Sequence, residues 1–139
     1  MSRGAFPALR TMTVAMSRYS VYTIKDGREL ARLARRRRVP PFHAGRRWVT
    51  ASKLWHKARE AREGMPVLFG DATDVSQLRY WGWLTEIAVG DRETSFKVDR
   101  LRKFKGKHAP QELTLRSSRM EIRPAFIRPY AICLTPRFL

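Results

Sequence analysis

The sequence predicts a single α+β domain in which about six strands form a small, mixed but mainly antiparallel β-barrel flanked by two or three helices. Its 139 residues are the usual length of one domain, and the 43% that are hydrophobic can bury a core. Two segments with helical periodicity come early, and β-branched and aromatic segments of strand length dominate the remainder. We expect residues 1–17 to be a poorly ordered arm and residues 18–139 to form the domain.

The domain opens with a strand and a helix. Residues 18–24, RYSVYTI, are rich in β-branched and aromatic side chains and predict the first strand. Asp26 then offers an N-cap, with Glu29 three residues later, which is the spacing of a capping box. A helix over residues 27–38 follows, with leucines on one face and arginines on the others, and Val39-Pro40-Pro41 ends it.

A second basic helix follows a loop. In residues 52–63, apolar side chains that include Trp55 recur at helical spacing and are expected to face the core, while lysines and arginines face outward. Thr50 or Ser52 is expected to cap the start of this helix. Gly64 is suited to its end, because glycine readily adopts the conformation that follows a helix.

The second half of the chain consists mainly of predicted strands. Residues 73–79 and 90–93 are interpreted as turns or loops, and residues 105–111 as a basic loop. Pro124 and Pro129 confine their segment to sheet edges or bulges, because proline donates no ladder hydrogen bond. The predicted strands and mostly extended segments are residues 65–72, 80–89, 94–104, 112–117 and 120–136.

The strand over residues 80–89, YWGWLTEIAV, contains a dense aromatic cluster. With side chains alternating between two faces, Trp81, Trp83 and Ile87 share one face. Gly82 and Leu84 lie on the other, so both faces carry apolar residues and the strand is expected to be buried on both sides. The two tryptophans are therefore predicted to be barrel core rather than an exposed stacking platform. A glycine here lets a ligand or another backbone approach closely.

The net charge of +17, from 29 lysines and arginines against 12 acids, is far beyond what solubility needs. Because self-repulsion at this level destabilises a compact chain, a polyanionic partner is expected, and RNA or DNA is the leading candidate. An anionic membrane surface is the second. No segment approaches the roughly 18 consecutive apolar residues of a membrane span, so the chain is not expected to cross a bilayer.

Cysteine and histidine usage argues against a disulfide framework and a zinc site. Cys133 is the single cysteine, which excludes an internal disulfide and is typical of a reducing compartment, so a cytoplasmic location is expected. Cys133 lies in an apolar run and is interpreted as a core residue. The histidines, His43, His56 and His108, are far apart and match no zinc spacing. We expect no metal and no cofactor.

The positive charge is concentrated in residues 28–62, which contain twelve lysines and arginines but only two acids, Glu29 and Glu60. This concentration predicts contact with a phosphate backbone, and the alternative is a solvated face. A second basic cluster in residues 100–107 would hold the far side of the same ligand, or is an exposed hairpin tip. The candidates for backbone contact are Arg35, Arg36, Arg37, Arg38, Arg46, Arg47, Lys53, Lys57, Arg102, Lys103 and Lys105.

Motifs of known catalytic classes are absent from the sequence. It has no glycine-rich phosphate loop, serine nucleophile elbow or paired-carboxylate motif. Asp71 and Asp74, in FGDATD, could bind a metal or act as a base, but acids in a turn more often cap and stabilise that turn. His108, in a basic loop, is a candidate nuclease base without a partner at a recognisable spacing.

The order of the predicted elements resembles that of the PUA-like superfamily, above all its EVE and YTH branches. The resemblance covers residues 19–139 and rests on YSVYTI, the arginine helix, RRWVTASKLW, PVLFGDA and YWGW. It implies a β-barrel that binds nucleic acid and holds a flipped or modified base in a pocket. In this resemblance Trp48, followed by Thr50 and Ser52, matches the position of the tryptophan that helps to hold the base. Thr50, Ser52 and Asp71 are the candidates for the polar groups that read the base edge, and the strand with Trp81, Gly82 and Trp83 is a candidate pocket wall.

Three functions remain open. The first is a non-enzymatic module that binds RNA or DNA through an arginine-rich surface and an aromatic pocket near Trp48. The second is a nuclease or base-processing enzyme that uses Asp71 or His108. The third is a structural component of a ribonucleoprotein, in which the charge serves only assembly. For Trp48 the alternative to a base-stacking role is a partly buried anchor under its loop.

Overall fold

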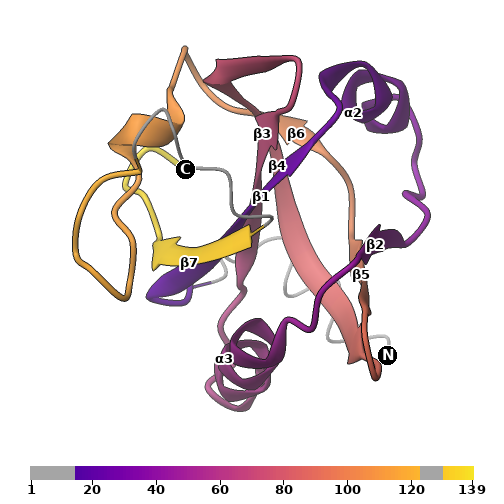
Figure 1. Ribbon diagram of the computed structural model, residues 1–139, viewed down its shortest axis with the longest axis vertical. Helices are drawn as coiled ribbons and strands as arrows, with labels where there is room; N and C mark the ends of the chain where they lie inside the picture. The colour runs from indigo at the N-terminus through magenta and orange to yellow at the C-terminus, as the bar shows by residue number, and fades with distance from the viewer. Residues whose placement is uncertain (1–14, 123–129) are drawn as a thin grey trace.

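The computed structural model describes residues 15–122 and 130–139 and confirms the α+β class (Figure 1). Seven strands form one curled, mostly antiparallel sheet, a half-barrel, and two α-helices pack against it. The elements are β1 (Tyr19–Lys25), α2 (Gly27–Ala34), β2 (Phe42–Ala44), α3 (Val49–Glu60), β3 (Pro66–Asp71), β4 (Asp74–Val89), β5 (Thr94–Val98), β6 (Arg102–Lys103), a 3₁₀ turn (Pro110–Glu112) and β7 (Tyr130–Leu134).

The strand order is β2-β5-β4-β3-β1-β7, and β6 pairs with β4. Only β1 and β3 pair in parallel among the described strands, with Val21 opposite Val67. The chain between them contains both helices, which is the long crossover that a parallel pair requires. On the other side of β1, the C-terminal strand β7 pairs antiparallel, so the first and last strands of the domain are neighbours.

Both faces of the sheet are covered, by different parts of the chain. Strand β3 is buried throughout, as predicted for residues 65–72. Val67 and Phe69 belong to the core beneath α2 and α3, whereas Leu68 belongs to a second core with Phe104 and Ile122 on the opposite face. Each large apolar side chain that becomes fully buried contributes about 1.5–3 kcal/mol, so two cores stabilise one thin sheet.

Helix α2 begins as predicted and ends earlier. The Asp26 carboxylate accepts hydrogen bonds from the backbone amides of Arg28 and Glu29, at 2.8 and 3.4 Å, and so caps the helix. The helix stops at Ala34 rather than at residue 38. Its two core-facing leucines, Leu30 and Leu33, precede that point, and no apolar side chain follows until Val39, which is buried in the core. The arginine run therefore lies in an irregular connection.

Helix α3 begins at Val49, and neither Thr50 nor Ser52 caps it. The N-cap residue is Trp48, whose side chain makes no capping hydrogen bond. The helix is held instead by its buried face. Trp55 is buried as predicted, and its Nε1–H donates to the Leu84 carbonyl of β4 at 3.0 Å. Tertiary packing thus fixes the start of this helix where local capping does not.

Strand β4 corrects two predictions. It starts at Asp74, so most of residues 73–79, interpreted as a loop, belong to the strand. The face toward α2 and α3 carries Tyr80 and Leu84, whereas Trp81 and Trp83 lie on the opposite, outer face. Trp81 packs there against the edge of the second core, and both tryptophans are only partly buried, so neither is the fully buried core residue that was predicted. A β-bulge between Leu84 and Glu86 then shifts the alternation. Ile87 consequently returns to the core side, opposite the face of the two tryptophans.

The segments after β4 are shorter than predicted. Residues 94–104 form two strands, because the chain turns at Asp99 between β5 and β6. Residues 112–122 are mostly irregular and form isolated bridges at Thr114 and Leu115. Of the C-terminal extended segment, β7 is confirmed. The edge positions expected of Pro124 and Pro129 lie outside the described residues.

The described structure begins inside the segment predicted to be an arm. The amide of Gly64 donates to the Ala15 carbonyl at 2.9 Å, and the amide of Ser17 donates to the Gly64 carbonyl at 2.8 Å. Residues 15–17 are thereby joined to the end of the α3 segment, and residues 1–14 lie outside the described part. Within the described residues, no helix has the length and apolarity needed to cross a membrane.

Candidate nucleic-acid interface

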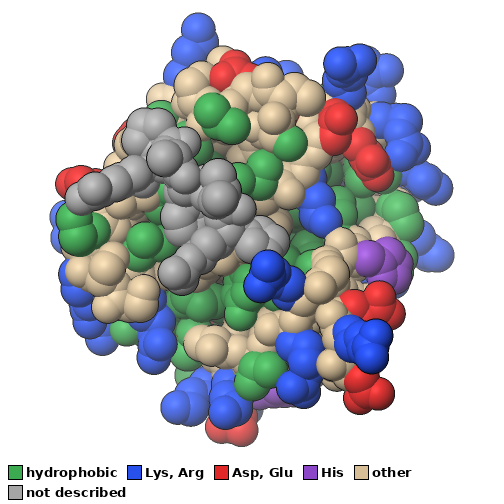
Figure 2. Space-filling view, in the orientation of Figure 1, with side chains coloured by type: hydrophobic (Ala, Val, Ile, Leu, Met, Phe, Trp, Pro, Cys, Tyr) green, Lys and Arg blue, Asp and Glu red, His purple; other side chains and the backbone are tan. Residues whose placement is uncertain are grey.

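The arginine run lies where a polyanion could reach it. Arg35, Arg36, Arg37 and Arg38 are all exposed, in the connection between α2 and β2. None of them forms an ion pair with another described residue. In Figure 2, lysine and arginine side chains crowd the rim of the molecule beside α2 and continue along much of its edge. Four uncompensated charges on one short segment create a strong local positive potential.

The other predicted backbone contacts differ in how free they are. Arg46, Lys53, Lys57, Lys103 and Lys105 are exposed. Arg47 and Arg102, by contrast, already donate side-chain hydrogen bonds to other residues of the protein.

Arg47 is exposed, but its Nε–H donates to the Gly90 carbonyl at 2.9 Å. Arg102 donates through both terminal nitrogens to Asp99, at 2.8 and 3.0 Å. This paired geometry neutralises most of the Arg102 charge locally. Of the two basic clusters, the one in residues 28–62 therefore keeps more of its positive charge unpaired.

Trp48 is buried, with only 1% of its surface exposed. Its ring stacks against Phe96 and Tyr130, each with a centroid distance of 4.6 Å. Its backbone amide donates to the Thr94 hydroxyl at 2.8 Å. The indole Nε1–H makes no hydrogen bond within the described structure, and it is the one buried side-chain polar atom there without a partner. The ring thus anchors the core and offers no open face for stacking.

Thr50 and Ser52 lie in the first turn of α3, exposed and partly buried respectively. No hydrogen bond of either side chain is found among the described residues, so both hydroxyls keep their hydrogen-bonding capacity. They lie close to Trp48 in sequence. Because the Trp48 ring is buried, no base can stack on it beside these two hydroxyls.

Asp71 is a structural carboxylate at the end of β3, and only 2% of its surface is exposed. It accepts hydrogen bonds from the Thr73 hydroxyl and amide and from the Gly27 amide, at 2.6, 2.8 and 3.0 Å, and from Arg79 Nε at 2.9 Å. Burial alone would raise the pKa of Asp71, but these hydrogen bonds outweigh it and hold the pKa below its usual value. The carboxylate joins the start of α2 to the β3–β4 turn and has little capacity left for a base edge.

Trp81 and Trp83 form the accessible aromatic surface among the predicted pocket residues. Their rings meet edge to face at 5.2 Å on the outer face of the sheet, and both are partly exposed. The guanidinium of Arg102 lies over Trp81, 5.2 Å from the ring centroid. Gly82 between them is buried on the core side, where an added Cβ would lie 2.6 Å from the Arg100 carbonyl. This glycine admits a backbone segment of the protein itself.

The predicted catalytic residues are also engaged by the protein. Asp74 accepts hydrogen bonds from the Ser76 amide and hydroxyl, as expected of a turn-forming acid. His108 Nδ1 lies 2.9 Å from a Glu112 oxygen, its Nε2 lies 2.9 Å from the Lys105 carbonyl, and its ring stacks on Phe138. Both ring nitrogens therefore lie within hydrogen-bonding distance of oxygen atoms of the protein itself.

Cys133 is buried, as predicted, and burial raises the pKa of its thiol to about 12. The thiol is therefore an inert core group at neutral pH. Within the described residues, no three histidine, cysteine, aspartate or glutamate side chains gather into a candidate metal site.

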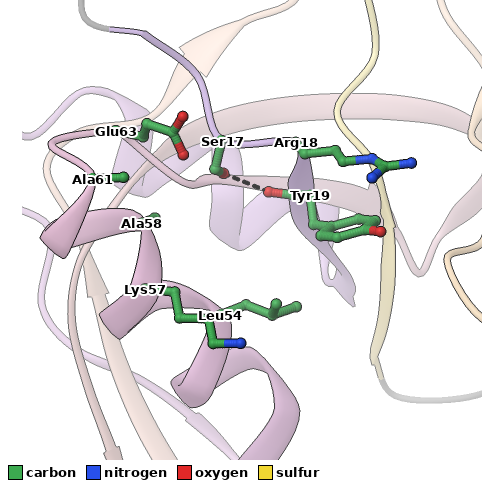
Figure 3. Close-up of a pocket in the computed structure, with 8 residues that line it drawn as sticks. All are labelled: Ser17, Arg18, Tyr19, Leu54, Lys57, Ala58, Ala61 and Glu63. Carbon is green, nitrogen blue, oxygen red and sulfur yellow. Dashed lines mark hydrogen bonds between the residues drawn. The ribbon is translucent and has the colours of Figure 1, made fainter.

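A groove between the start of β1 and α3 was not predicted from the sequence (Figure 3). This groove, of about 260 Å³, is lined on one side by Arg18 and Tyr19 and on the other by α3 residues that include Leu54 and Lys57. The guanidiniums of Arg18 and Arg116 lie over the Tyr19 ring, 5.4 and 5.0 Å from its centroid. In the sequence only the adjacent pair Arg18-Tyr19 indicates this site, because Arg116, which contacts the Tyr19 ring without lining the groove, is brought there by the fold.

The comparisons with known proteins identify no relative. The chain matches no family model, no curated protein and no solved structure. The class that fold and site define is therefore a basic α+β half-barrel with exposed cationic and partly exposed aromatic surfaces.

Proposed function

We propose that this chain is a non-enzymatic module, of PUA-like fold, that binds RNA or DNA. The observation that carries the proposal is the arginine run, residues 35–38, exposed and without ion pairs to described residues in a chain of net charge +17. Four guanidiniums so close together repel one another, and a phosphate backbone removes that cost. Binding releases counterions from the nucleic acid, so affinity falls steeply with salt.

The PUA-like part of the proposal is supported by the order of the elements. A first strand, a helix, a loop ending in Trp48, a second helix, a buried strand and an aromatic strand follow one another as the resemblance implies. The curled sheet is consistent with a barrel-related architecture. The charge argument does not depend on this assignment.

The aromatic part of the proposal rests on Trp81 and Trp83. An unstacked base on a partly exposed indole contributes about 1–3 kcal/mol to binding, and the Arg102 guanidinium beside Trp81 widens the stacking surface. Trp48 is buried and does not offer a stacking surface. Its unpaired Nε1–H could donate to a ligand acceptor only after the rings that cover it move, so it is not the primary contact.

The test is a binding panel of single- and double-stranded RNA and DNA, with and without base modifications, across a salt series. Replacing Arg36, Arg37 and Arg38 with glutamine leaves Arg35, the C-cap residue of α2, in place. The replacement should lower the slope of log affinity against log salt by about 2 for single strands. The matched control is the triple glutamine variant at the exposed arginines outside the run, Arg92, Arg119 and Arg137.

No binding of the unmodified chain to any nucleic acid at low salt would overturn the proposed function. Degradation of the labelled strands that is lost on His108→Ala or Asp71→Ala would establish the enzymatic alternative instead. Loss of binding in the arginine variant with no effect of Trp81→Ala or Trp83→Ala would restrict the function to charge-driven assembly.

A further inference from the structure

We infer that the groove between β1 and α3 binds one nucleotide of a single strand, with the phosphate at the Arg18–Arg116 end and the base over α3. The inference rests on the proposed function and deepens it, because it assigns a second, separate subsite. One wall of the groove is formed by α3 and its C-terminal end. Leu54, Ala58 and Ala61 face β1 at helical spacing, and the two small alanines leave a hollow where larger side chains would close the gap.

The size of the hollow limits its occupant. Pockets for cofactors and drug-sized ligands are about 300–1,000 Å³, and this groove, at about 260 Å³, lies just below that range. It suits one flat ring rather than a helix or an extended cofactor. Figure 3 shows Tyr19 and Arg18 extending side by side from β1, with Leu54 reaching toward Tyr19 from α3, so the wall at this end is both apolar and cationic.

The charges around the groove are unevenly distributed. Arg18 and Arg116 both lie on the Tyr19 ring, and neither forms an ion pair within the described part of the chain. Lys57 adds a third cation from α3, and it too has no such partner. Like charges held on one ring repel each other unless an anion lies between them. Guanidiniums pair with phosphate through two parallel hydrogen bonds, which makes phosphate the matching anion.

The opposite end of the groove orients the ligand. Glu63 is the acidic residue that lines it, and Figure 3 places Glu63 away from the Tyr19 ring. A phosphate is repelled from that end and attracted to the arginine end, while the base lies over the apolar middle. A nucleotide has this distribution of charge and apolar surface. An apolar peptide side chain would use the middle and leave the cations unpaired.

The experiment measures binding of a short fluorescein-labelled oligouridylate to the full chain by fluorescence anisotropy. Tyr19→Ala is expected to weaken binding by about 5- to 100-fold, because it removes the ring that forms one wall of the groove and carries Arg18 and Arg116, whereas Tyr19→Phe keeps the ring and should bind normally. Arg116→Gln should weaken binding and lower the salt slope by about 0.7. The control is Arg119→Gln, an exposed arginine three residues away with no contact to Tyr19, which should have little effect.

A second variant separates binding from folding. Ala61 is exposed at the end of α3, so Ala61→Gln should leave the thermal unfolding midpoint unchanged while its side chain covers the groove and weakens binding. Normal binding by Tyr19→Ala, Arg116→Gln and Ala61→Gln overturns the subsite but leaves the proposed function intact. Polyglutamate competing as well as unlabelled oligouridylate overturns the base-binding part. Failure of the unmodified chain to bind overturns both proposals.

Discussion

The two faces of the half-barrel use tryptophan in opposite ways. On the face covered by α2 and α3, Trp48 and Trp55 are buried among aliphatic and aromatic side chains. On the outer face, Trp81 and Trp83 remain partly exposed beside Arg102. The first pair supplies stability, and the second supplies a surface. The same residue type therefore has a different role according to the face of the sheet on which it packs.

The comparison extends to polar groups. Where the sheet meets α2, Asp71 is saturated by hydrogen bonds from residues of the protein itself. Around the outside, Arg18, Arg116 and the arginine run have no carboxylate partners within the described structure. Groups that are already satisfied hold the fold together, and groups left unsatisfied at the surface are available for a partner.

The largest expected effect is on Trp48. Trp48→Ala should lower the free energy of unfolding by about 3–5 kcal/mol, because it leaves a cavity between Phe96 and Tyr130. Trp83→Ala should cost only about 1–3 kcal/mol, because water already reaches part of that ring. Urea denaturation of both variants measures the difference.

Trp48→Phe sharpens the same comparison. It removes an indole N–H that has no partner, so it should cost clearly less than the alanine variant. A phenylalanine variant as unstable as the alanine variant would show that the Nε1–H has a partner after all. Equal losses from Trp48→Ala and Trp83→Ala would remove the distinction between the two faces.

The next expected effect is on the stability that Asp71 contributes and on its dependence on pH. Asp71→Asn should cost about 1–3 kcal/mol at neutral pH, since a charge-assisted network is weakened. Because the folded pKa is lowered, the carboxylate contributes its stability above the ordinary value of 3.8 and loses it as pH falls through the folded pKa. The difference in unfolding free energy between the two proteins should therefore be constant near neutrality and shrink below pH 3.8.

Asp74→Asn is the matched control for this prediction. Asp74 lies in the same turn and accepts from Ser76 in the same pattern, but it is less buried than Asp71, and within the described residues its carboxylate accepts hydrogen bonds from Ser76 alone. Its replacement should have a smaller effect at neutral pH. A larger loss from Asp74→Asn than from Asp71→Asn would show that the turn itself, and not the link to α2, is what Asp71 stabilises.

Much of the fold was predictable from local patterns. The buried strand β3, the Asp26 cap and the burial of Trp55 and Ala58 in α3 follow from composition and periodicity, and all are confirmed. Ala61, which the same periodicity places on the core face, is exposed because the helix ends at Glu60. The face of Trp81 was not predictable, because both faces of β4 carry apolar residues near it. The bulge after Leu84, which moves Ile87 to the core, has no local signal.

The candidate site was predictable only in its charge. The arginine run stands out in the sequence, and its exposure follows from the lack of apolar residues in it. The burial of Trp48 depends on Phe96 and Tyr130, which are distant in sequence. The Tyr19 ring likewise meets Arg116, which comes from the other end of the chain. Contacts of this kind are created by topology and leave no trace in a short motif.

The smallest expected effect is that of Gly45→Ala, and Gly82→Ala provides the contrast. An alanine Cβ at Gly82 would lie 2.6 Å from the Arg100 carbonyl, a backbone atom that can move only with its segment, so Gly82→Ala should cost about 1–3 kcal/mol. Gly45→Ala meets nothing within 4 Å and should be neutral or slightly stabilising. Thermal unfolding of both variants measures the contrast. Because Arg100 precedes Arg102 in the same turn, the Gly82 variant should also displace the guanidinium over Trp81 and weaken oligonucleotide binding. Weakened stability with unchanged binding would separate the close backbone packing on the core side of β4 from the aromatic surface on its outer side.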